Sequence, residues 1–487
     1  MGRRTGAALL GAALACAVLP GVAHADVTDA AVAGELPDTV AINSLWVVVA
    51  ALLVIFMQAG FAFLEIGFSR AKNAGTVVAK ILTNFSIAAL AYYAVGFAFA
   101  FGNGDIIGTH GFLLRDYGDP QQAFGIMGLS DATIESKWLF QFSFCAVSLA
   151  IVWGTTLERI KFGVYIIYAI VFAAFIYPIA SHWVFGGGWL QANLGMQDFA
   201  GSTAVHLIGA TGALAVLLQL GARRGKYGSD GKPRAIPGHS MPLFGLGVLI
   251  LWLGWFGFNP GSTLNAMDGR FPEVAMVTML AAASGVLGAI LVARWKTGTI
   301  DIGMAGNGAI GALVAITAPS GYVEAWAAPV IGLIAGIIVP LGVYAIDRYI
   351  DDPVGALTAH GLCGVWGTLA CGLFTSPRLA EYNAVGDPGL IYTGSFHQIG
   401  VQALGIVVVF SFVFVLSYVT FAIIKATYGL RVTAEEEEAG LDISEHGMYG
   451  YPEQFIPAPE LIGYSPAPGP VPARETPRGA TTKEVPV

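Results

Sequence analysis

The chain has 487 residues, of which 55% are hydrophobic and 11% are charged, and its formal net charge is −8. Soluble globular proteins carry roughly 25% charged residues, so this composition excludes a soluble fold and indicates a chain that is solvated by a lipid bilayer. The few Lys and Arg residues are scattered along the chain, which excludes a basic patch for nucleic acid.

The N-terminus has the pattern of a secretory signal peptide. Two arginines near the start precede an apolar stretch at 7–19, and an A-x-A cleavage site follows at 23–25. We expect residues 1–25 to be removed, so that Asp26 begins the mature chain outside the membrane. The alternative is an uncleaved first helix, for which the apolar stretch is short.

Eleven apolar segments follow, each near the ~20 residues that a membrane-spanning helix needs. They occupy 43–69, 76–101, 137–156, 161–180, 201–221, 240–258, 272–294, 298–318, 324–346, 355–374 and 397–425. None of them shows the strict alternation of a membrane strand. We therefore predict an all-α integral membrane protein of eleven transmembrane helices, with its membrane domain at 26–431.

Positive charge is distributed unequally between the two sides of this predicted bundle. An outside N-terminus and eleven spans place the C-terminus in the cytoplasm. The loops on the cytoplasmic side hold Arg70, Lys72, Lys80, Arg159, Lys161, Arg223, Arg224, Lys226, Lys232, Arg234, Arg294, Lys296, Arg348, Lys425 and Arg431. The loops on the other side hold only Arg115, Lys137, Arg270 and Arg378. This bias agrees with the positive-inside rule for a protein of the plasma or inner membrane.

Two of the predicted spans share an internal spacing. Asp198 is followed eight residues later by His206, and Asp352 is followed eight residues later by His360. These are the fifth spans of two halves that run in opposite directions, as in the inverted repeats of many transporters. Eight helical residues rise ~12 Å and the hydrocarbon core is ~30 Å thick. Histidines that enter from opposite faces are therefore expected to meet near the midplane.

An ionisable residue deep in a span marks a functional site by default. The alternative is a neutral histidine held by a backbone carbonyl, which suits a lone histidine better than a mirrored pair. Imidazole both donates and accepts hydrogen bonds and titrates near neutrality. The pair therefore suits the path of a small polar molecule or the relay of a proton. His182, His239 and His397 lack such pairing, so we expect structural or surface roles for them.

Signals for enzymatic chemistry are missing from the sequence. Cys145, Cys363 and Cys371 lie inside apolar segments without metal-ligand spacing, and Cys16 lies in the signal peptide. The spans contain no nucleophile–base pair and no phosphate-binding loop. We expect no catalytic residue, no metal and no cofactor, and we predict that the protein is not an enzyme.

The cytoplasmic tail is assigned to 432–487. Its acidic run from Glu435 to Glu438 is expected to form a solvated face. Beyond about Tyr451 the tail is rich in Pro and poor in large apolar residues, which predicts disorder.

Seven motifs carry a resemblance to a known family. They are FLEIGFSRAKN (63–73), FQFSFCAVSLAIVWGTTLERIKF (140–162), HWVFGGGW (182–189), DFAGSTAVH (198–206), WFGFNPGS (255–262), DDPVGALTAHGLCGVWG (351–367) and GLRVTAEEEEAGLDISEHG (429–447). At these residues the chain resembles the ammonium transporter family (Amt/Mep/Rh), and the last motif and DFAGSTAVH are similar to its Amt branch. The resemblance covers about residues 43–450. It implies an eleven-helix bundle, in which helices one to five and six to ten form inverted repeats, and a homotrimer with one pore per subunit.

The resemblance also implies an outer site that recruits ammonium. Its matching positions are Phe144, Phe185, Phe258 and Ser262. A cation over an aromatic face gains ~0.5–2 kcal/mol, and a serine oxygen accepts a hydrogen bond from an N–H donor. Phe144 and Phe258 also match the stacked rings that close the family's pore mouth.

Four further positions match the pore and its surroundings. His206 and His360 match the twin histidines of the pore. Asp198 matches a buried carboxylate that either stabilises the incoming charge or caps its helix. Gln141 matches a polar residue near the same vestibule.

One position departs from the family pattern. Phe185 stands where Trp is usual, and Phe is the weaker cation–π partner and lacks the indole N–H. The recruitment site is therefore expected to be weaker. Trp183 and Trp189 lie nearby in sequence, where they either compensate or serve as anchors at the membrane interface.

By this resemblance the protein transports ammonium, with methylammonium as an analogue, for nitrogen assimilation. The tail resembles the segment by which such transporters meet a cytoplasmic PII signalling protein. Two alternatives stay open: an electroneutral ammonia channel, and an ammonium sensor that signals through its tail. Sensors of this family often carry an added cytoplasmic signalling domain, and the tail at 432–487 is too short and polar to be one.

Overall fold

The computed structural model describes residues 36–115, 118–128 and 131–455. The predicted signal peptide at 1–25 and the end of the tail at 456–487 lie outside these residues. Within the described part the regular structure is helical, and the only β-pairings are isolated bridges such as that of Ile160 with Arg431. The predicted all-α class is confirmed.

Ten helical segments among the described residues are long and apolar enough to cross a membrane. In chain order they contain α3 (Asp38–Phe68); α4 (Ala74–Ala91) with η2 (Tyr92–Gly96) and α5 (Phe97–Phe101); α7 (Ile134–Gly154); α8 (Phe162–Val171) with η5 (Phe172–Ile176) and α9 (Tyr177–Phe185); η6 (Ser202–Leu207) with α11 (Ile208–Leu220); α12 (Met241–Gly261); α13 (Phe271–Thr297); α15 (Ala327–Ile346); η8 (Leu357–Leu362) with α16 (Cys363–Phe374); and α19 (His397–Thr427). The segment expected at 298–318 is α14 (Ile302–Thr317), an apolar helix of 16 residues. Because α14 is shorter than the ~20 residues that a span needs, the count of eleven stays a prediction.

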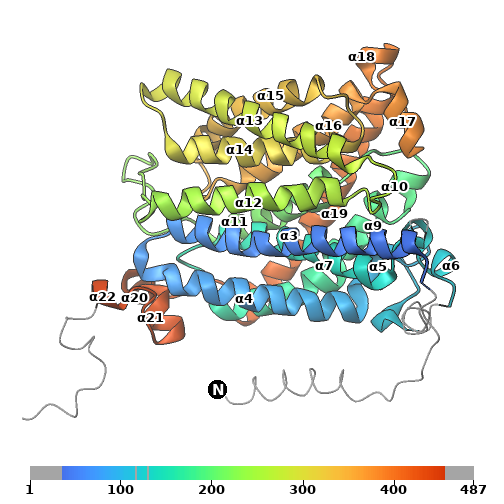
Figure 1. The fold of residues 1–487 in the computed structure, drawn as a ribbon. Helices are drawn as coiled ribbons and strands as arrows, with labels where there is room; N and C mark the ends of the chain where they lie inside the picture. The colour runs from blue at the N-terminus through green and yellow to red at the C-terminus, as the bar shows by residue number, and fades with distance from the viewer. Residues whose placement is uncertain (1–35, 116–117, 129–130, 456–487) are drawn as a thin grey trace, which may run out of the picture.

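Short helices connect the spans and form the tail. They are η1 (Ala71–Asn73), η3 (Phe112–Leu114), α6 (Pro120–Phe124), η4 (Gly125–Gly128), α10 (Trp189–Ala192), η7 (Pro319–Gly321), α17 (Pro377–Asn383), α18 (Leu390–Thr393), α20 (Ala434–Ala439), α21 (Leu441–His446) and α22 (Pro452–Phe455). In Figure 1, α10, α17 and α18 lie at one end of the bundle and α20–α22 at the other. We call the first end the outer face and the second the inner face, following the orientation predicted from charge.

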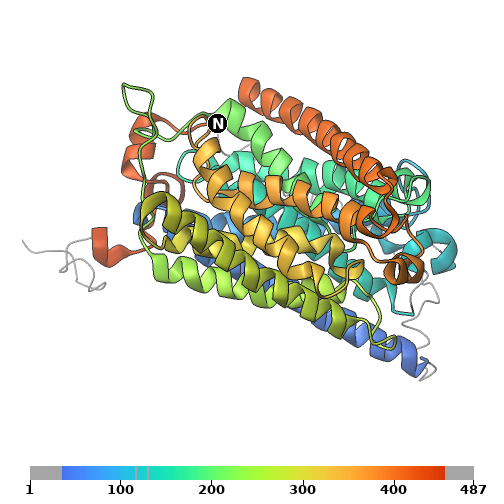
Figure 2. The ribbon, with the colours of Figure 1, turned by 90° about the horizontal axis from the view of Figure 1, so that it is seen from above.

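The long helices run side by side between the two faces (Figure 1). Glycine allows the close approach of α3 and α12. A Cβ on Gly67 of α3 would lie 2.5 Å from the backbone nitrogen of Phe244 in α12, and one on Gly60 would lie 2.8 Å from Cγ of Leu251. Any larger residue at these positions would push α3 and α12 apart, which is why small residues are common at membrane helix contacts. Figure 2 shows α19 along the edge of the bundle opposite α3 and α12.

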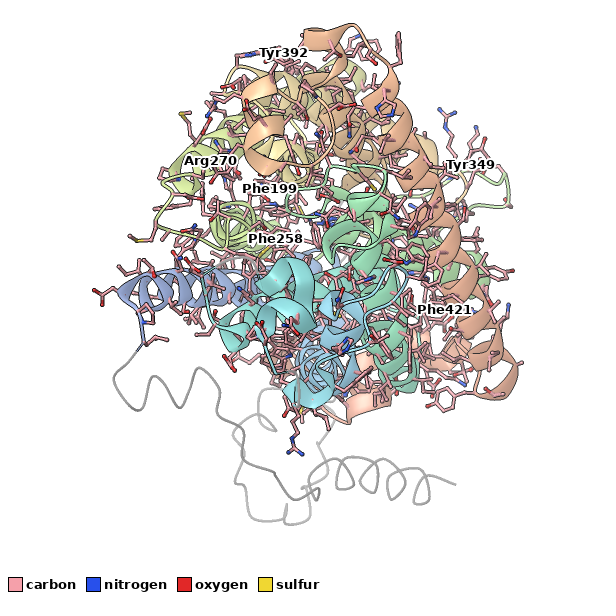
Figure 3. All side chains as sticks on the ribbon, turned by 90° about the vertical axis from the view of Figure 1, so that its right-hand side faces the viewer. Phe199, Phe258, Arg270, Tyr349, Tyr392 and Phe421 are labelled. Carbon is pink, nitrogen blue, oxygen red and sulfur yellow. The ribbon has the colours of Figure 1, made fainter. Side chains whose placement is uncertain are left out.

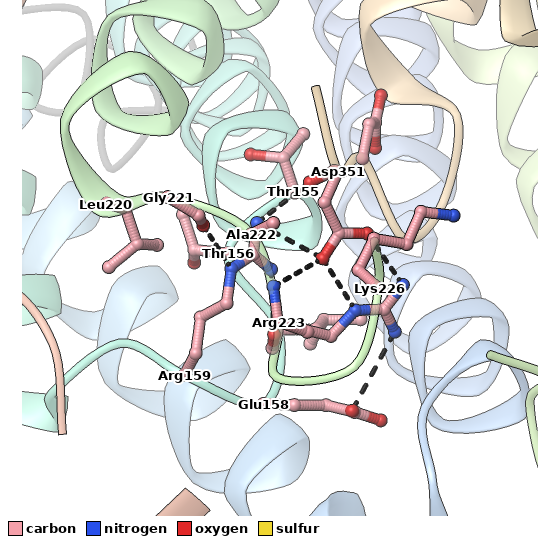
Figure 4. Close-up of polar contacts among 12 residues, drawn as sticks. Thr155, Thr156, Glu158, Arg159, Leu220, Gly221, Ala222, Arg223, Lys226 and Asp351 are labelled. Atoms are coloured by element: carbon pink, nitrogen blue, oxygen red, sulfur yellow. Dashed lines mark hydrogen bonds and ion pairs between the residues drawn. The ribbon is translucent and has the colours of Figure 1, made fainter. Parts of the chain in front are cut away.

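A buried ionic cluster holds the loops of the inner face (Figure 4). Arg223 donates two hydrogen bonds of 2.9 Å to the carboxylate of Asp351, and Arg159 donates to its backbone carbonyl at 2.8 Å. Glu158 lies 3.7 Å from Arg223. Burial alone would raise the pKa of Asp351, but the hydrogen bonds from Arg223 and the charge of Arg159 lower it to about 2. The cluster fixes the loop that leads into η8.

The tail packs against this inner face. Asp442 accepts hydrogen bonds from the backbone nitrogens of Gly75 (2.9 Å) and Thr76 (2.8 Å) at the start of α4. The prediction of a solvated acidic run is wrong for Glu437, which is 2% exposed. Its carboxylate accepts hydrogen bonds of 2.7 Å from Arg431 and from the backbone nitrogen of Arg224. Burial of this one acid is possible because both partners satisfy its charge.

Candidate functional site

Two aspartates set the starts of the spans that contain His206 and His360. The carboxylate of Asp198 accepts hydrogen bonds from four successive backbone nitrogens, those of residues 201–204, at 2.7–3.0 Å. Asp352 accepts from the nitrogens of Val354, Gly355 and Leu357 at 2.7–3.3 Å. The first turns of a helix leave backbone N–H groups unpaired, and these side chains satisfy them. The capping role considered for Asp198 is therefore present in the structure.

Each of these spans opens with a wide π-helical turn that contains the histidine. Residues 202–207 form η6 around His206, and residues 357–362 form η8 around His360. The two side chains are 0% and 5% exposed, and their Nδ1 atoms lie 3.2 Å apart. They meet as the shared Asp–His spacing predicts. At this distance one ring must donate and the other accept, so the pair holds one proton between its two Nδ1 atoms.

Aromatic rings form a continuous stack from the histidines toward the outer face. The ring of His206 lies 5.4 Å from Phe258 with an interplanar angle of 22°. Phe258 in turn stacks on Phe144, with centroids 4.0 Å apart and an angle of 9°. In Figure 3, which looks onto the outer face, Phe258 lies near the middle of the bundle. The predicted pair of stacked phenyl rings therefore lies directly above the histidines.

Sequence reasoning missed Trp255, which also packs on the histidine pair. Its ring lies 5.2 Å from that of His206 at 22°, and its indole N–H donates to Thr317 at 2.9 Å. The sequence spacing could have identified Trp255, because it precedes Phe258 by three residues and so lies on the same helix face.

A cavity of about 320 Å³ opens above the stack, and we call it the outer vestibule. Its lining includes Gln141, Phe144, Phe185, Asp198 and Ser262. The structure thus brings together five of the six residues expected at the recruitment site. The sixth, Phe258, is buried beneath Phe144.

The vestibule offers hydrogen-bond acceptors as well as rings. Oε1 of Gln141 is buried and has no partner among the described residues. The hydroxyl of Ser262 donates to the carbonyl of Phe258 at 2.9 Å, so the lone pairs of its oxygen remain for a donor in the cavity. Phe185 lies across the vestibule, 6.5 Å from Phe144 between ring centroids. Such a lining suits a small cation with N–H donors.

Trp183 and Trp189 do not line the vestibule. Trp183 is 8% exposed, and its indole N–H donates to the carbonyl of Ile106 at 2.8 Å. It packs on the ring of Phe412 at 4.6 Å, so it is a packing residue inside the protein. Neither Trp183 nor Trp189 therefore takes the place of the Trp that is usual at position 185.

Below the histidines lies a second, much smaller cavity of about 20 Å³, which we call the inner cavity. His360, Asn307 and Glu65 contribute polar groups to a lining that is otherwise apolar. Glu65 lies in α3 and forms an ion pair with Lys80 of α4. No role was assigned to Glu65 from the sequence, and Lys80 was counted as an inner-loop charge, but both lie within spans and are buried.

The three histidines without a mirrored partner, His182, His239 and His397, have local contacts. Both ring nitrogens of His182 lie 2.8 Å from backbone carbonyls, those of Ala100 and Gly104. His239 contacts the carbonyl of Ser69, and His397 lies exposed beside Asp387. These contacts agree with structural and surface roles.

Comparison with known proteins decides the family. A family model described as "Ammonium Transporter Family" matches residues 45–451. The chain belongs to the ammonium transporter family. Ammonium transporter Amt2 of Archaeoglobus fulgidus is 42% identical over 465 residues, which cover 92% of this chain and 96% of that protein. The ammonium transporter of Bacillus subtilis is 34% identical over 414 residues, covering 83% of this chain and 97% of its own.

Solved structures of this ammonium transporter family have the same fold. A structure named "Sensor Amt Protein" matches with a TM-score of 0.76 and 37% identity over 84% of this chain and 99% of that one. Mep2 of Candida albicans matches with a TM-score of 0.73 and 29% identity over 82% and 88% of the two chains. The predicted family and the predicted class, a helical membrane protein of ammonium transport, are confirmed.

Proposed function

We propose that this member of the ammonium transporter family binds ammonium in the outer vestibule, removes one proton and conducts ammonia past His206 and His360 to the inner face. The observation that carries the proposal is the continuity of the site. A vestibule suited to an N–H-bearing cation ends on two stacked phenyl rings, and a hydrogen-bonded histidine pair follows directly below them.

Recruitment rests on the lining of the vestibule. Ammonium has four N–H donors and no acceptor, so it needs acceptors and negative potential around it. Gln141 and Ser262 supply oxygens, and the rings of Phe144 and Phe185 supply faces for a cation. Asp198 adds a negative charge at the cavity wall, beyond its role as a cap.

Passage below the vestibule requires loss of the charge. Phe144 and Phe258 stack at 4.0 Å, and a hydrated ion cannot pass between rings at that separation. Carrying a permanent cation through an apolar path costs much more than carrying a neutral amine. Ammonium can lose a proton and cross as ammonia, whereas potassium cannot, so the path selects between two ions of similar size.

The histidine pair supports both the passage of ammonia and the movement of the proton. It offers donors and acceptors to ammonia, and its shared proton position allows a proton to move between the rings. If the proton crosses by this route while ammonia crosses beside it, net transport is electrogenic.

The direct test is a transient current from proteoliposomes of purified protein after a jump of ammonium and, separately, of potassium. The proposal predicts an inward current with ammonium and none with potassium. A rise of internal pH without current would instead identify the electroneutral ammonia channel. Ammonium binding with neither current nor pH change would identify a sensor, a role suggested by the name of one similar structure.

We also propose the assembly and orientation that the resemblance implies. These are a homotrimer with one pore per subunit, cleavage of residues 1–25, a membrane domain at 26–431 and a cytoplasmic tail at 432–487. Binding of a PII protein at the inner face is supported by the tail, because α20 and α21 pack beside the loops of that face. Protease protection in right-side-out vesicles would test the orientation, and co-purification with a PII protein would test the partner.

A further inference from the structure

Glu65 and Lys80 form a buried ion pair within the membrane-spanning part of the protein. Glu65 is 1% exposed in α3, and Lys80 is 0% exposed in α4. Ionised side chains inside a membrane span are costly and mark functional sites. A buried ion pair is also a poor source of stability, because its desolvation offsets its attraction. The pair therefore calls for a role beyond joining two helices.

The two carboxylate oxygens of Glu65 have different surroundings. Oε2 is bonded to Nζ of Lys80. Oε1 is buried and has no hydrogen-bond partner among the described residues. A Cβ built on Gly154, which lines the inner cavity, would lie 3.4 Å from this Oε1. The unpartnered oxygen thus lies at the cavity wall.

His360 lines the same cavity. Its Nδ1 contacts His206, so Nε2 is the ring nitrogen left for another partner. A cavity needs roughly 10–15 Å³ to hold one water molecule, together with two to four polar partners. The inner cavity, at about 20 Å³, is large enough, and His360, Glu65 and Asn307 offer polar atoms.

We propose that Glu65, with its charge balanced by Lys80, accepts the proton that leaves the histidine pair toward the inner face. The inference rests on the proposed function, because it assigns the next step of the proton's path. When the transported proton has made His360 an imidazolium, its Nε2–H bond breaks, the proton passes to a water molecule in the inner cavity, and a proton of that water bonds to Oε1 of Glu65. His360 is then neutral and Glu65 is a carboxylic acid. Loss of that proton to water at the inner face restores the carboxylate, and the charge of Lys80 stabilises it in this state.

The test uses a double variant, Glu65→Gln with Lys80→Met, so that no unpaired charge stays buried. In proteoliposomes, the ammonium-evoked current should fall on the order of tenfold or more, as is usual when a positioned proton acceptor is removed. Ammonia should still pass, so the liposome interior should become more alkaline after an ammonium jump. The matched control is Arg224→Gln with Glu438→Gln, an exposed inner-face pair at 2.8 Å, which should keep the wild-type current.

Gly154→Ala provides a second variant that keeps both charges. Its added methyl would lie 3.4 Å from Oε1 of Glu65 and 3.2 Å from Val354, and it would take the space of the water. Gly154→Ala should lower the current and preserve alkalinisation. If the double variant cannot be reconstituted, Gly154→Ala alone tests whether the proton passes to Glu65.

Three results would overturn the assignment. A double variant with wild-type current would show that the proton does not need Glu65. A variant that loses both current and alkalinisation would show that Glu65 serves the ammonia path. Wild-type protein without current would overturn the electrogenic mechanism itself, and this inference with it.

Discussion

The two cavities on either side of the histidine pair differ in size and in chemistry. The outer vestibule, at about 320 Å³, is lined by aromatic rings and neutral acceptors, with the carboxylates of Asp198 and Asp268 at its wall. The inner cavity, at about 20 Å³, has Glu65 at its wall, and Glu65 is ion-paired with Lys80. A wide aromatic cavity suits selection of a cation from solution, whereas a water-sized cavity with a carboxylate suits the exit of a proton. The difference fits the proposed path, in which the histidines separate a binding site from a release site.

The aspartate caps of the His206 and His360 spans also differ, in the number of backbone N–H groups that each satisfies, and this difference yields the largest expected effect. Asp198→Ala leaves four buried backbone N–H groups unpaired, at roughly 1–3 kcal/mol each, whereas Asp352→Ala leaves three. We expect Asp198→Ala to lower the thermal unfolding temperature in detergent by more than Asp352→Ala does. Asp198→Asn, which keeps one acceptor oxygen, should lie between wild type and Asp198→Ala. Equal stability of all four proteins would contradict this account of the caps.

The inner face should respond to acid through Asp351. The pKa of Asp351 is lowered to about 2 from an ordinary value of 3.8. Its contribution to the free energy of unfolding is therefore full above about pH 4 and is lost as the pH falls toward 2. A shift of this size corresponds to about 2 kcal/mol of unfolding free energy. The thermal unfolding temperature, measured from pH 6 to pH 2.5, should fall with the pH. Asp351→Asn should remove the part of this fall that is due to Asp351. If Asp351→Asn loses stability in acid as wild type does, another group must cause the acid sensitivity.

Ser262→Ala tests the acceptors of the outer vestibule. It removes one oxygen that can bind ammonium, a loss of about 1 kcal/mol, so KM for ammonium should rise roughly fivefold. The maximal current should stay near wild type, because the histidine path is untouched. The control is Thr297→Ala at the inner end of α13, which is not expected to change KM. An unchanged KM in Ser262→Ala would remove Ser262 from the recruitment site.

Phe185→Trp should give the smallest change in KM for ammonium, and it should lower KM where Ser262→Ala raises it. Indole is the better cation–π partner, by about 0.5 kcal/mol at a partly exposed site, so KM should fall about twofold. The ring lies beside Gly201, where a built Cβ would be 3.3 Å from Cζ of Phe185. Phe185→Leu is the matched comparison and should raise KM. If both variants raised KM equally, ring shape rather than cation–π attraction would govern this position.

The fold and most of the candidate site could be predicted from the sequence. Span positions follow from hydrophobicity, because bilayer thickness fixes the length of a spanning helix. The meeting of His206 with His360 follows from the spacing to their caps, since a helix has a fixed rise per residue. The vestibule residues come from the family resemblance, and the structure gathers them around one cavity.

What could not be predicted depends on contacts between distant segments. Lys80 lies near the inner end of its span, so its charge alone assigns it to a loop, and only its pairing with Glu65 in another helix explains its burial. Glu437 belongs to an acidic run that suggests solvent exposure, yet Arg431 and the backbone of Arg224 satisfy it. Composition does not reveal such partners, because they are set by tertiary packing.

In the proposed mechanism, ammonium loses its proton in the outer vestibule, and ammonia and the proton then pass the histidine pair separately. The most direct measurement compares ammonium and potassium currents of wild-type protein with those of the His206→Ala, His360→Ala double variant in proteoliposomes. We predict that wild type carries a current with ammonium and none with potassium, and that the double variant loses this separation, either by losing the ammonium current or by admitting potassium. A double variant that keeps both the ammonium current and the exclusion of potassium would contradict the account.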